Sequence, residues 1–345
     1  MSYDLVEMNT ALDKNLVVGQ QANHVASRYI FDSYLQRKSQ NTIRAQRADL
    51  DTFVEYLANV GIETSSEALQ AVPSAWQFIT WGLVEAFVRW MLAAGYSTST
   101  VNRKLSTVKV YTKLAFKADI ISPEENAKLR LVSGYTDTDA THIDEKREIT
   151  RLSNKKEESN FLSPKQYFQL VDMQDDTPAG ARNKVILGLL FEYGLRVNEV
   201  VSLPLSAIDL NNGTMKIYRK KTGVTTLFDL LETPEFYRLL KNYIENHSFD
   251  EQIELVRASL KSSELVEKGL STVAVYKLVK KWGESIGVDN LSPHDARHTW
   301  AQLAIDSGAN LLDIQRSGGW KTNAMLLEYA DKAKKANKGI NVMSR

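Results

Sequence analysis

The first third of the chain places apolar residues at helical spacing. Residues 42–61 form one such segment, which reaches Gly61, a residue type that commonly follows the last turn of a helix. Its apolar stripe consists of Ile43, Leu50, Phe53, Val54 and Leu57. The pattern therefore predicts an amphipathic helix whose stripe packs against a helical core.

Residues 97–120 form a second helical segment, with Ser or Thr at positions 97–99 as candidate N-caps. One face carries apolar or small residues, namely Val101, Leu105, Val108, Thr112 and Ala115. The other carries basic residues, with no acidic residue before Asp119: Arg103, Lys104, Lys109, Lys113 and Lys117. A solvated face usually mixes both signs, so a stripe that faces DNA phosphates and an ordinary solvated face both remain open.

The pattern changes in the second half of the chain. Residues 183–194 are apolar on all sides, which is typical of a fully buried helix, and they end at Gly194. Residues 208–230 consist of short β-rich runs separated by Asn-Gly and Thr-Gly turns, which predicts a small antiparallel sheet. Helical spacing returns from about residue 233.

A polar, charged segment lies between these two regions. Residues 135–160 contain almost no large apolar side chain, so they cannot bury a core of their own. The chain has 345 residues, more than one hydrophobic core normally serves. We therefore predict a mainly α protein with a small antiparallel β-sheet, divided into a helical domain at 1–134, an interdomain linker at 135–160 and a second domain at 161–345.

Composition excludes several classes of protein. The chain has no cysteine, which rules out a disulfide scaffold, a thiolate metal site and a cysteine nucleophile. The N-terminus lacks a signal-peptide pattern, and the longest apolar run, 185–191, is too short to span a bilayer, so we expect a soluble cytoplasmic protein. The net charge of +1 does not decide whether DNA is bound, because phosphate binding depends on local clusters of Lys and Arg.

The end of the predicted buried helix carries the first candidate site residues. Arg196 follows Gly194, and Glu199 lies three residues further on. Glu199 can fix the guanidinium of Arg196 while other N–H groups of that guanidinium stay free for a phosphate. A purely structural Arg–Glu pair is the alternative.

A second candidate site lies at the start of a predicted helix. Ser292 or Pro293 begins this helix and places His294 and Arg297 three residues apart near its N-terminus. Free N–H groups and the helix dipole favour an anion at such a helix end. A core histidine beside a surface arginine is the alternative.

The tip of the predicted hairpin is basic. Arg219, Lys220 and Lys221 come directly before a Thr-Gly turn. A lysine on a turn can donate a proton in a neighbouring site, because a nearby phosphate keeps it charged. Lysines at a hairpin tip also protect a sheet edge from association, which is the alternative.

Trp320 and Tyr329 are nine residues apart and follow two glycines. On one straight helix they would lie on opposite faces and could not serve one site. Thr322 or Asn323 is a candidate N-cap, so we predict that a helix begins close to Asn323 and leaves Trp320 in the preceding turn. Taken alone, Tyr329 is more typical of a helix core residue with a solvated hydroxyl.

These motifs together resemble the tyrosine recombinases, also called phage-type integrases. The resemblance covers most of the chain: the segment from residue 97 is similar to a helix of the core-binding domain, and residues from about 160 onward are similar to the catalytic domain. Many members have His where this chain has Trp320, and the tryptophan variant resembles the Cre-like branch of the family. The matching catalytic set is Arg196, Lys221, His294, Arg297, Trp320 and Tyr329.

The resemblance implies a helical core-binding domain followed by an α+β catalytic domain. It implies a site-specific DNA recombinase that cuts and rejoins strands through a 3′-phosphotyrosyl intermediate and a Holliday junction. Such chemistry conserves the phosphodiester energy, so no ATP or other cofactor is expected, and no metal ion is expected because two arginines would replace its charge. The implied partners are double-stranded DNA with a specific recombination site and further copies of the chain, as a homotetramer on two sites and a monomer or weak dimer in solution.

In this resemblance each site residue has a role. Tyr329 would be the nucleophile, and Arg196 and Arg297 would hold the non-bridging oxygens of the scissile phosphate. Lys221 would protonate the leaving 5′ oxygen. Lys220 and Lys221 point to opposite sides of a strand, and we choose Lys221 because it lies directly before the turn.

The remaining roles are supporting ones. His294 would assist proton transfer, Trp320 would donate its indole N–H to the phosphate or pack the site, and Glu199 would brace Arg196. Residues 271–285 form a capped basic helix that is a candidate groove reader. The expected DNA contacts are Arg103, Lys104, Lys109, Lys113, Lys117, Arg219, Lys277, Lys280 and Lys281.

Other functions share this chemistry. The chain could be a phage or mobile-element integrase or an Xer-like dimer resolvase. A type IB topoisomerase or telomere resolvase is less consistent with the predicted N-terminal helices and the modest length, and a DNA-binding relative without catalysis is disfavoured because all the expected side chains are present. The target DNA sequence is not encoded in any motif.

Overall fold

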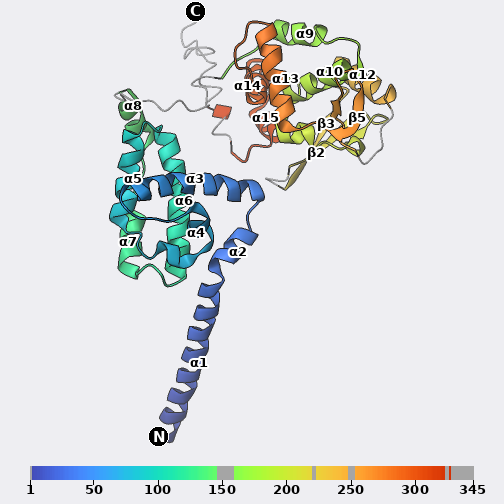
Figure 1. Cartoon of the computed structure of the whole chain (residues 1–345). Coiled ribbons are helices and arrows are strands. Elements are labelled where there is room, and N and C mark those ends of the chain that lie inside the picture. Colours follow the sequence, from blue (N-terminus) through green and yellow to red (C-terminus); the bar gives the residue numbers. More distant parts are fainter. Residues whose placement is uncertain (1, 146–158, 220–222, 248–252, 323–325, 328–345) are drawn as a thin grey trace, which may run out of the picture. The chain divides into compact units, whose positions relative to one another are not determined.

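The computed structural model of the chain divides into two compact units, Met1–Asn154 and Lys155–Arg345 (Figure 1). Each unit has its own cluster of buried hydrophobic side chains. No helix in the described part of the chain is long and apolar enough to cross a membrane. The structure describes residues 2–145, 159–219, 223–247, 253–322 and 326–327.

The first unit consists of helices. A 3-10 turn at Pro73–Trp76 lies between α4 and α5. The helices are α1 (Ser2–Arg28), α2 (Ile30–Gln36), α3 (Gln40–Asn59), α4 (Ser66–Ala71), α5 (Trp81–Ala93), α6 (Thr98–Lys117), α7 (Pro123–Leu131) and α8 (Asp137–Glu145).

The two helices predicted in this unit are confirmed. Helix α3 is N-capped by Ser39, and the chain turns at Gly61 with φ +83°. Helix α6 is N-capped by Ser97, whose side chain accepts the backbone N–H of Thr100. Both helices direct their apolar stripes into the core, which is rich in aromatic rings. Trp76, for example, stacks on Tyr111 and donates its indole N–H to the backbone.

The predicted linker is partly folded. Residues 137–145, which lie within the segment 135–160, form helix α8, and this helix packs against α6. Asn102 of α6 holds the start of this region, because its side chain exchanges two hydrogen bonds with the backbone of Tyr135 at 2.7 and 2.8 Å. Sequence analysis missed α8 because a short polar helix draws its stability from a neighbouring helix rather than from an apolar stripe.

The second unit contains helices and two small sheets. The helices are α9 (Pro164–Asp172), α10 (Pro178–Phe191), α11 (Val197–Val201), α12 (Pro234–Glu245), α13 (Thr272–Ser285), α14 (Pro293–Asp306) and α15 (Leu311–Gly318), with a 3-10 turn at Leu205–Ala207. The strands are β1 (Ile208–Asp209), β2 (Thr214–Arg219), β3 (Val224–Asp229), β4 (Arg257–Ser259) and β5 (Leu265–Gly269).

Strands β1, β2 and β3 form the predicted antiparallel sheet in sequence order. Side chains on β2 alternate, so that Met215, Ile217 and Arg219 are buried. The second sheet, β4 paired with β5, was not predicted. Its strands are short, and neither has an apolar alternation that sequence analysis could recognise.

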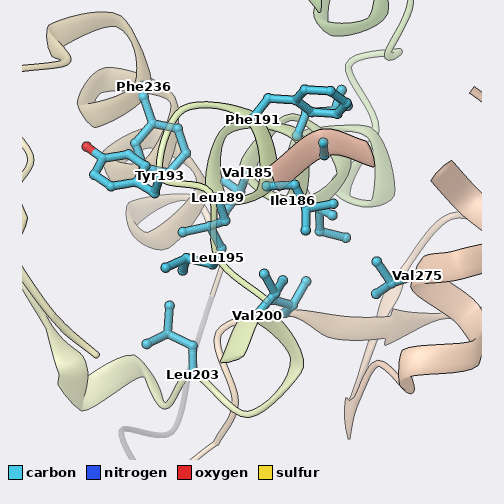
Figure 2. Close-up of a cluster of buried hydrophobic side chains, with 14 of the residues drawn as sticks. Val185, Ile186, Leu189, Phe191, Tyr193, Leu195, Val200, Leu203, Phe236 and Val275 are labelled. Carbon is cyan, nitrogen blue, oxygen red and sulfur yellow. The ribbon is translucent and has the colours of Figure 1, made fainter. Parts of the chain in front are cut away.

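Helix α10 lies at the centre of the second unit and packs against α9, α12 and α14. Most of its side chains are buried on all sides, as predicted, and Figure 2 shows several of them within the core. The chain leaves this helix through Gly194, which has φ +59°. A Cβ at this position would clash with the ring of Trp300, so the glycine permits both the turn and the close approach of α14.

Candidate active site

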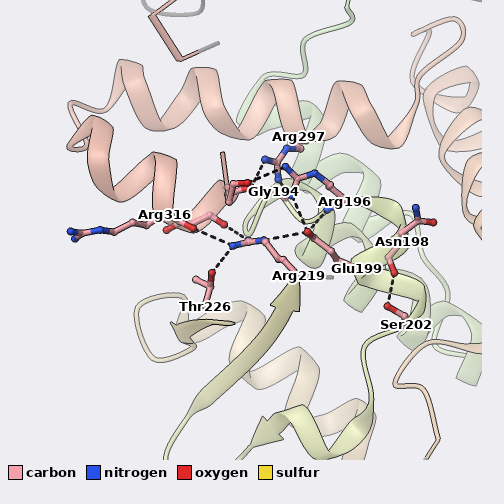
Figure 3. Close-up of polar contacts among 12 residues, drawn as sticks. Gly194, Arg196, Asn198, Glu199, Ser202, Arg219, Thr226, Arg297 and Arg316 are labelled. Carbon is pink, nitrogen blue, oxygen red and sulfur yellow. Dashed lines mark hydrogen bonds and ion pairs between the residues drawn. The ribbon is translucent and has the colours of Figure 1, made fainter. Parts of the chain in front are cut away.

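Arg196 lies at the N-terminus of α11, directly after the buried helix. Its Nη1 donates to Oε1 of Glu199 at 2.9 Å, and its backbone N–H donates to Oε2 of the same residue at 2.9 Å. The side chain of Arg196 is 38% exposed, whereas that of Glu199 is 10% exposed. The predicted Arg–Glu pair is therefore present (Figure 3), and the side chain of Arg196 stays partly exposed.

Helix α14 carries His294 and Arg297, and it begins at Pro293 as predicted. Ser292 is the N-cap and forms a capping box with Asp295, which fixes the first turn of the helix. The guanidinium of Arg297 is buried and donates to the carbonyl of Gly194 at 2.6 Å. Arg297 thus links the start of α14 to the turn after α10.

The end of α15 meets the same two arginines. Arg297 donates through Nη2 to the carbonyl of Gly318, and Arg196 donates through Nη2 to the carbonyl of Gly319 at 3.3 Å. Carbonyl groups in the last turn of a helix have no intrahelical partner, so these arginines provide one. Arg297 and Arg196 therefore lie beside Gly318 and Gly319, the two glycines that precede Trp320.

Trp320 lies outside any helix, directly after the left-handed C-cap at Gly319. Its ring lies 4.0 Å from the Arg297 guanidinium carbon and stacks on Trp300 at 5.9 Å. The indole therefore shields the buried arginine through a cation–π contact. Trp300 was not singled out in the sequence, although its position three residues after Arg297 places it near the same face of α14.

His294 is exposed, and its ring lies 4.2 Å from that of His298 in an edge-to-face arrangement. Partial desolvation lowers the pKa of His294, and the positive charges of Arg297 and Arg196 lower it further. Asp295 acts in the opposite direction. At neutral pH the imidazole is therefore neutral and can accept a proton.

Arg219 does not fit the role that the sequence suggested. It was expected to contact DNA at a hairpin tip, but its side chain is 1% exposed and pairs with Glu199. The alternation of β2 directs it inward with Met215 and Ile217, and this alternation was the signal that sequence analysis overlooked. We therefore withdraw Arg219 as a DNA contact.

Lys104 is corrected for a similar reason. It is 6% exposed, donates to Thr52 Oγ1 at 2.7 Å and lies 3.6 Å from Asp49. Val101, Lys104 and Val108 belong to one helical stripe, so the position faces α3 rather than solvent. Asp49 and Thr52 satisfy the buried ammonium, which excludes a phosphate contact.

The other basic residues of α6 differ in exposure. Lys113 and Lys117 are exposed. Lys109 donates to two carbonyls near the end of α7, at 2.6 and 3.1 Å, and Arg103 pairs with Asp49 while its side chain stays 55% exposed. An open groove of about 690 Å³ is lined in part by Lys109, Lys113 and Lys117. This face of α6 thus combines a groove with exposed positive charge.

The basic residues of α13 are on its exposed face. Lys277, Lys280 and Lys281 are exposed, whereas Val275 and Val279 on the opposite face are buried. Lys280 lies 3.9 Å from Glu284, which is one turn away. The predicted groove-reading helix therefore exists, and its role in DNA binding stays a prediction.

Two members of the predicted set, Lys221 and Tyr329, lie outside the described residues. Helical backbone is present at Leu326 and Leu327, and Trp320 is not part of that segment. The predicted break between Trp320 and the last helix is therefore present, although its expected start near Asn323 lies outside the described residues. Within the described chain, no group of three or more His, Asp or Glu side chains could hold a metal ion.

Comparison with known proteins identifies the family. The phage integrase family model matches residues 160–336, and the model of the N-terminal SAM-like domain of phage integrases matches residues 29–119. The two matched regions are therefore the N-terminal and catalytic domains of a tyrosine recombinase. The chain belongs to the phage integrase family.

Relatives of the chain include Xer recombinases. The chain is 25% identical over 288 residues to tyrosine recombinase XerC of Roseiflexus castenholzii, which covers 80% of this chain and 78% of the relative. It is 31% identical over 140 residues to XerA of Saccharolobus solfataricus, covering 41% and 42%. The resemblance of this chain to the Cre-like branch of the family, which rests on Trp320, stays a prediction.

Solved structures share the fold. A lambda integrase(75–356) dimer bound to a COC′ core site has a TM-score of 0.58 at 15% identity, covering 92% of this chain and 97% of that chain. The Tn1549 transposon integrase in complex with a circular intermediate DNA has a TM-score of 0.52 at 15% identity, covering 82% and 96%. At this level of identity the likeness establishes a common architecture.

Proposed function

We propose that this chain is a site-specific DNA recombinase that cleaves and rejoins strands through a phosphotyrosine. The observation that carries the proposal is the meeting of Arg196, Arg297 and Trp320 at the end of α15, a short distance along the chain before Tyr329. The partly exposed Arg196 can donate N–H groups to a phosphate that gains charge during substitution, and the buried Arg297 adds its positive charge beneath Trp320. The family match supports the same chemistry.

In the proposed reaction the hydroxyl oxygen of Tyr329 attacks the scissile phosphorus. A P–O bond to the tyrosine forms, and the bond between phosphorus and the 5′ oxygen breaks. Lys221 gives a proton to that 5′ oxygen, and neutral His294 accepts the proton that leaves the tyrosine. A 5′-hydroxyl from the partner strand then attacks the phosphotyrosine, so that a bond from phosphorus to this 5′ oxygen forms and the bond to Tyr329 breaks. The proton of the hydroxyl passes to Lys221, and His294 returns its proton to the tyrosine oxygen, which rejoins the DNA without a nucleotide cofactor.

Arg196 and Glu199 have separate tasks in this reaction. Arg196 reaches solvent and offers N–H groups to a non-bridging oxygen, while Glu199 fixes its direction. We propose that the positive charges of Arg196 and Arg297 replace the metal ion that other phosphoryl-transfer enzymes use. The proposed partner is a duplex with a specific recombination site, bound by four copies of the chain through a Holliday junction.

The test of this function is the trapping of a covalent protein–DNA adduct. A duplex is first selected from a random pool by binding to the full chain, and it is then nicked near the cleavage point so that the adduct accumulates. We expect a detergent-resistant protein–DNA band in EDTA, and no band with Tyr329→Phe. Absence of the band on a bound site, or its persistence in Tyr329→Phe, would contradict the proposal.

A further inference from the structure

Arg219 is a buried arginine that joins three elements of the second unit. It is the last residue of β2, and it donates to Thr226 on β3. It also donates through Nη1 to the carbonyl of Arg316 at 3.2 Å and through Nη2 to the carbonyl of Ser317. The guanidinium thus connects the β2–β3 hairpin to the last turn of α15 (Figure 3).

Arg219 also shares the carboxylate that holds Arg196. Its Nε donates to Oε1 of Glu199 at 3.2 Å, and the same oxygen accepts Nη1 of Arg196 at 2.9 Å. One negative charge is therefore divided between two positive charges, and the three groups together carry a net charge of +1. Without Arg219, the carboxylate would neutralise Arg196 alone and weaken its attraction for a phosphate.

The second partner of Arg196 is held by Arg219 as well. Arg196 donates to the carbonyl of Gly319 at 3.3 Å. The backbone of Gly319 lies directly against Arg219, since a Cβ there would be 2.5 Å from Cδ and 2.6 Å from Nε. Both acceptors of the Arg196 guanidinium, Glu199 and the Gly319 carbonyl, are thus fixed by one buried side chain.

We propose that Arg219 is a positioning residue that shares Glu199, so that the pair Arg196–Glu199 keeps a net positive charge for the scissile phosphate and Arg196 stays directed at it. The inference rests on the proposed function, because it assigns Arg219 to the same reaction. Arg219 is buried and does not touch the DNA. Its substitution therefore slows the chemical step while DNA affinity is retained.

The test compares a single and a double variant that differ in the charge at position 199. The quantity measured is the single-turnover rate of adduct formation on the selected, nicked duplex. Arg219→Met is expected to lower this rate by about 10- to 100-fold, by analogy with the loss of a residue that orients a metal ligand, with DNA affinity retained in a gel-shift titration. In the Glu199→Gln/Arg219→Met double variant the unshared negative charge is absent. Cleavage by the double variant is therefore expected to be at least about fivefold faster than by Arg219→Met.

A purely structural role predicts the opposite order. Two lost contacts would make the double variant as slow as Arg219→Met or slower, and that result would overturn the inference, as would an unchanged rate in Arg219→Met. Arg219→Lys keeps a cation beside Glu199 and is expected to retain most of the cleavage rate. A loss of rate in Arg219→Lys as large as in Arg219→Met would also overturn the inference. If Arg219→Met does not fold, the rate of Arg219→Lys is compared with that of the unmodified chain instead, and a loss of about 10-fold or more would overturn the inference.

Arg182 provides the matched control. It is similarly buried, at 3% exposure, and donates to the carbonyl of Arg257 at 2.9 Å. Within the described residues it forms no hydrogen bond with Arg196, Glu199 or Arg297. Arg182→Met is expected to lower the melting temperature and leave the cleavage rate unchanged below it. If the unmodified chain forms no adduct, the proposed function itself fails; if it does and the double variant shows no recovery, only the role of Arg219 fails.

Discussion

Glu199 is 10% exposed and lies between two guanidinium groups, so its single charge serves both of them. This arrangement explains how two like charges, Arg196 and Arg219, remain close together in a partly buried place. Burial lowers the pKa of Arg219, and Glu199 opposes that effect. The residue-level chemistry of the site is therefore set by a shared ion pair and by backbone carbonyls.

The lowered pKa of His294 leads to a pH prediction. Since desolvation and nearby arginines favour the neutral ring, the imidazole stays able to accept a proton down to pH values below the ordinary histidine pKa of about 6.5. We expect the single-turnover cleavage rate to be level near neutral pH and to fall only below pH about 6.5. His294→Gln should be slower and should lack this acid limb.

The control for this prediction is DNA binding measured over the same pH range. Binding by the unmodified chain should change little where the cleavage rate falls. An acid limb that persists unchanged in His294→Gln would show that another group titrates.

Sequence alone predicted some of these residues and misplaced others. The Arg196–Glu199 pair could be predicted because both partners are one helical turn apart, and the structure confirms it. Arg219 and Lys104 could not be placed from charge alone, because the sequence does not show which buried acid or carbonyl will satisfy them. Strand alternation and the helical stripe pointed inward at both positions, and these were better guides than charge.

At the scale of elements, the end of α15 determines the geometry of the site. Gly319 has φ +62°, which ends the helix and turns the chain before Trp320. The helix ends in carbonyls that bind Arg196 and Arg297 from two other helices. The position of α15 therefore fixes both arginines relative to the segment that continues towards Tyr329.

Helix α6 supplies a prediction about DNA binding. Lys113 and Lys117 are exposed beside a groove, and each is expected to neutralise a phosphate. Lys113→Ala or Lys117→Ala should weaken binding and reduce the slope of log K against log salt by about 1 each. Fluorescence titrations at several salt concentrations measure this slope.

Arg89 on α5 is the matched control, because it is exposed and pairs with Glu85 at 3.6 Å. Arg89→Ala removes the same charge and should leave the salt slope unchanged. An equal change of slope in all three variants would mean that net charge, and not the α6 face, governs binding.

The helices were more predictable than the sheets and the linker. Ser97 and Ser292 are local N-cap signals, and each marks the start of an observed helix. Helix α8 packs against α6, a partner that no local pattern encodes, and the β4–β5 hairpin joins two short strands that lack an apolar alternation. The structure confirmed the elements that carry an N-cap signal or a periodic apolar pattern.

At the scale of the whole molecule, the chain consists of two units, Met1–Asn154 and Lys155–Arg345, and an interdomain linker at 135–160 stays a prediction. The proposed assembly places two copies on one recombination site and four copies where two sites meet. Light scattering coupled to size exclusion should give these copy numbers for Tyr329→Phe on duplexes with one site and on mixtures that synapse. A single copy on every duplex would contradict the proposed tetramer.

We propose that Tyr329 becomes covalently joined to DNA at a site formed by Arg196 and Arg297. Mass spectrometry of the protease-digested, nuclease-trimmed adduct from the unmodified chain tests this directly. We expect one nucleotide-bearing peptide, modified at Tyr329 through a 3′-phosphate. A nucleotide on any other residue, or a 5′-phosphate linkage, would contradict it.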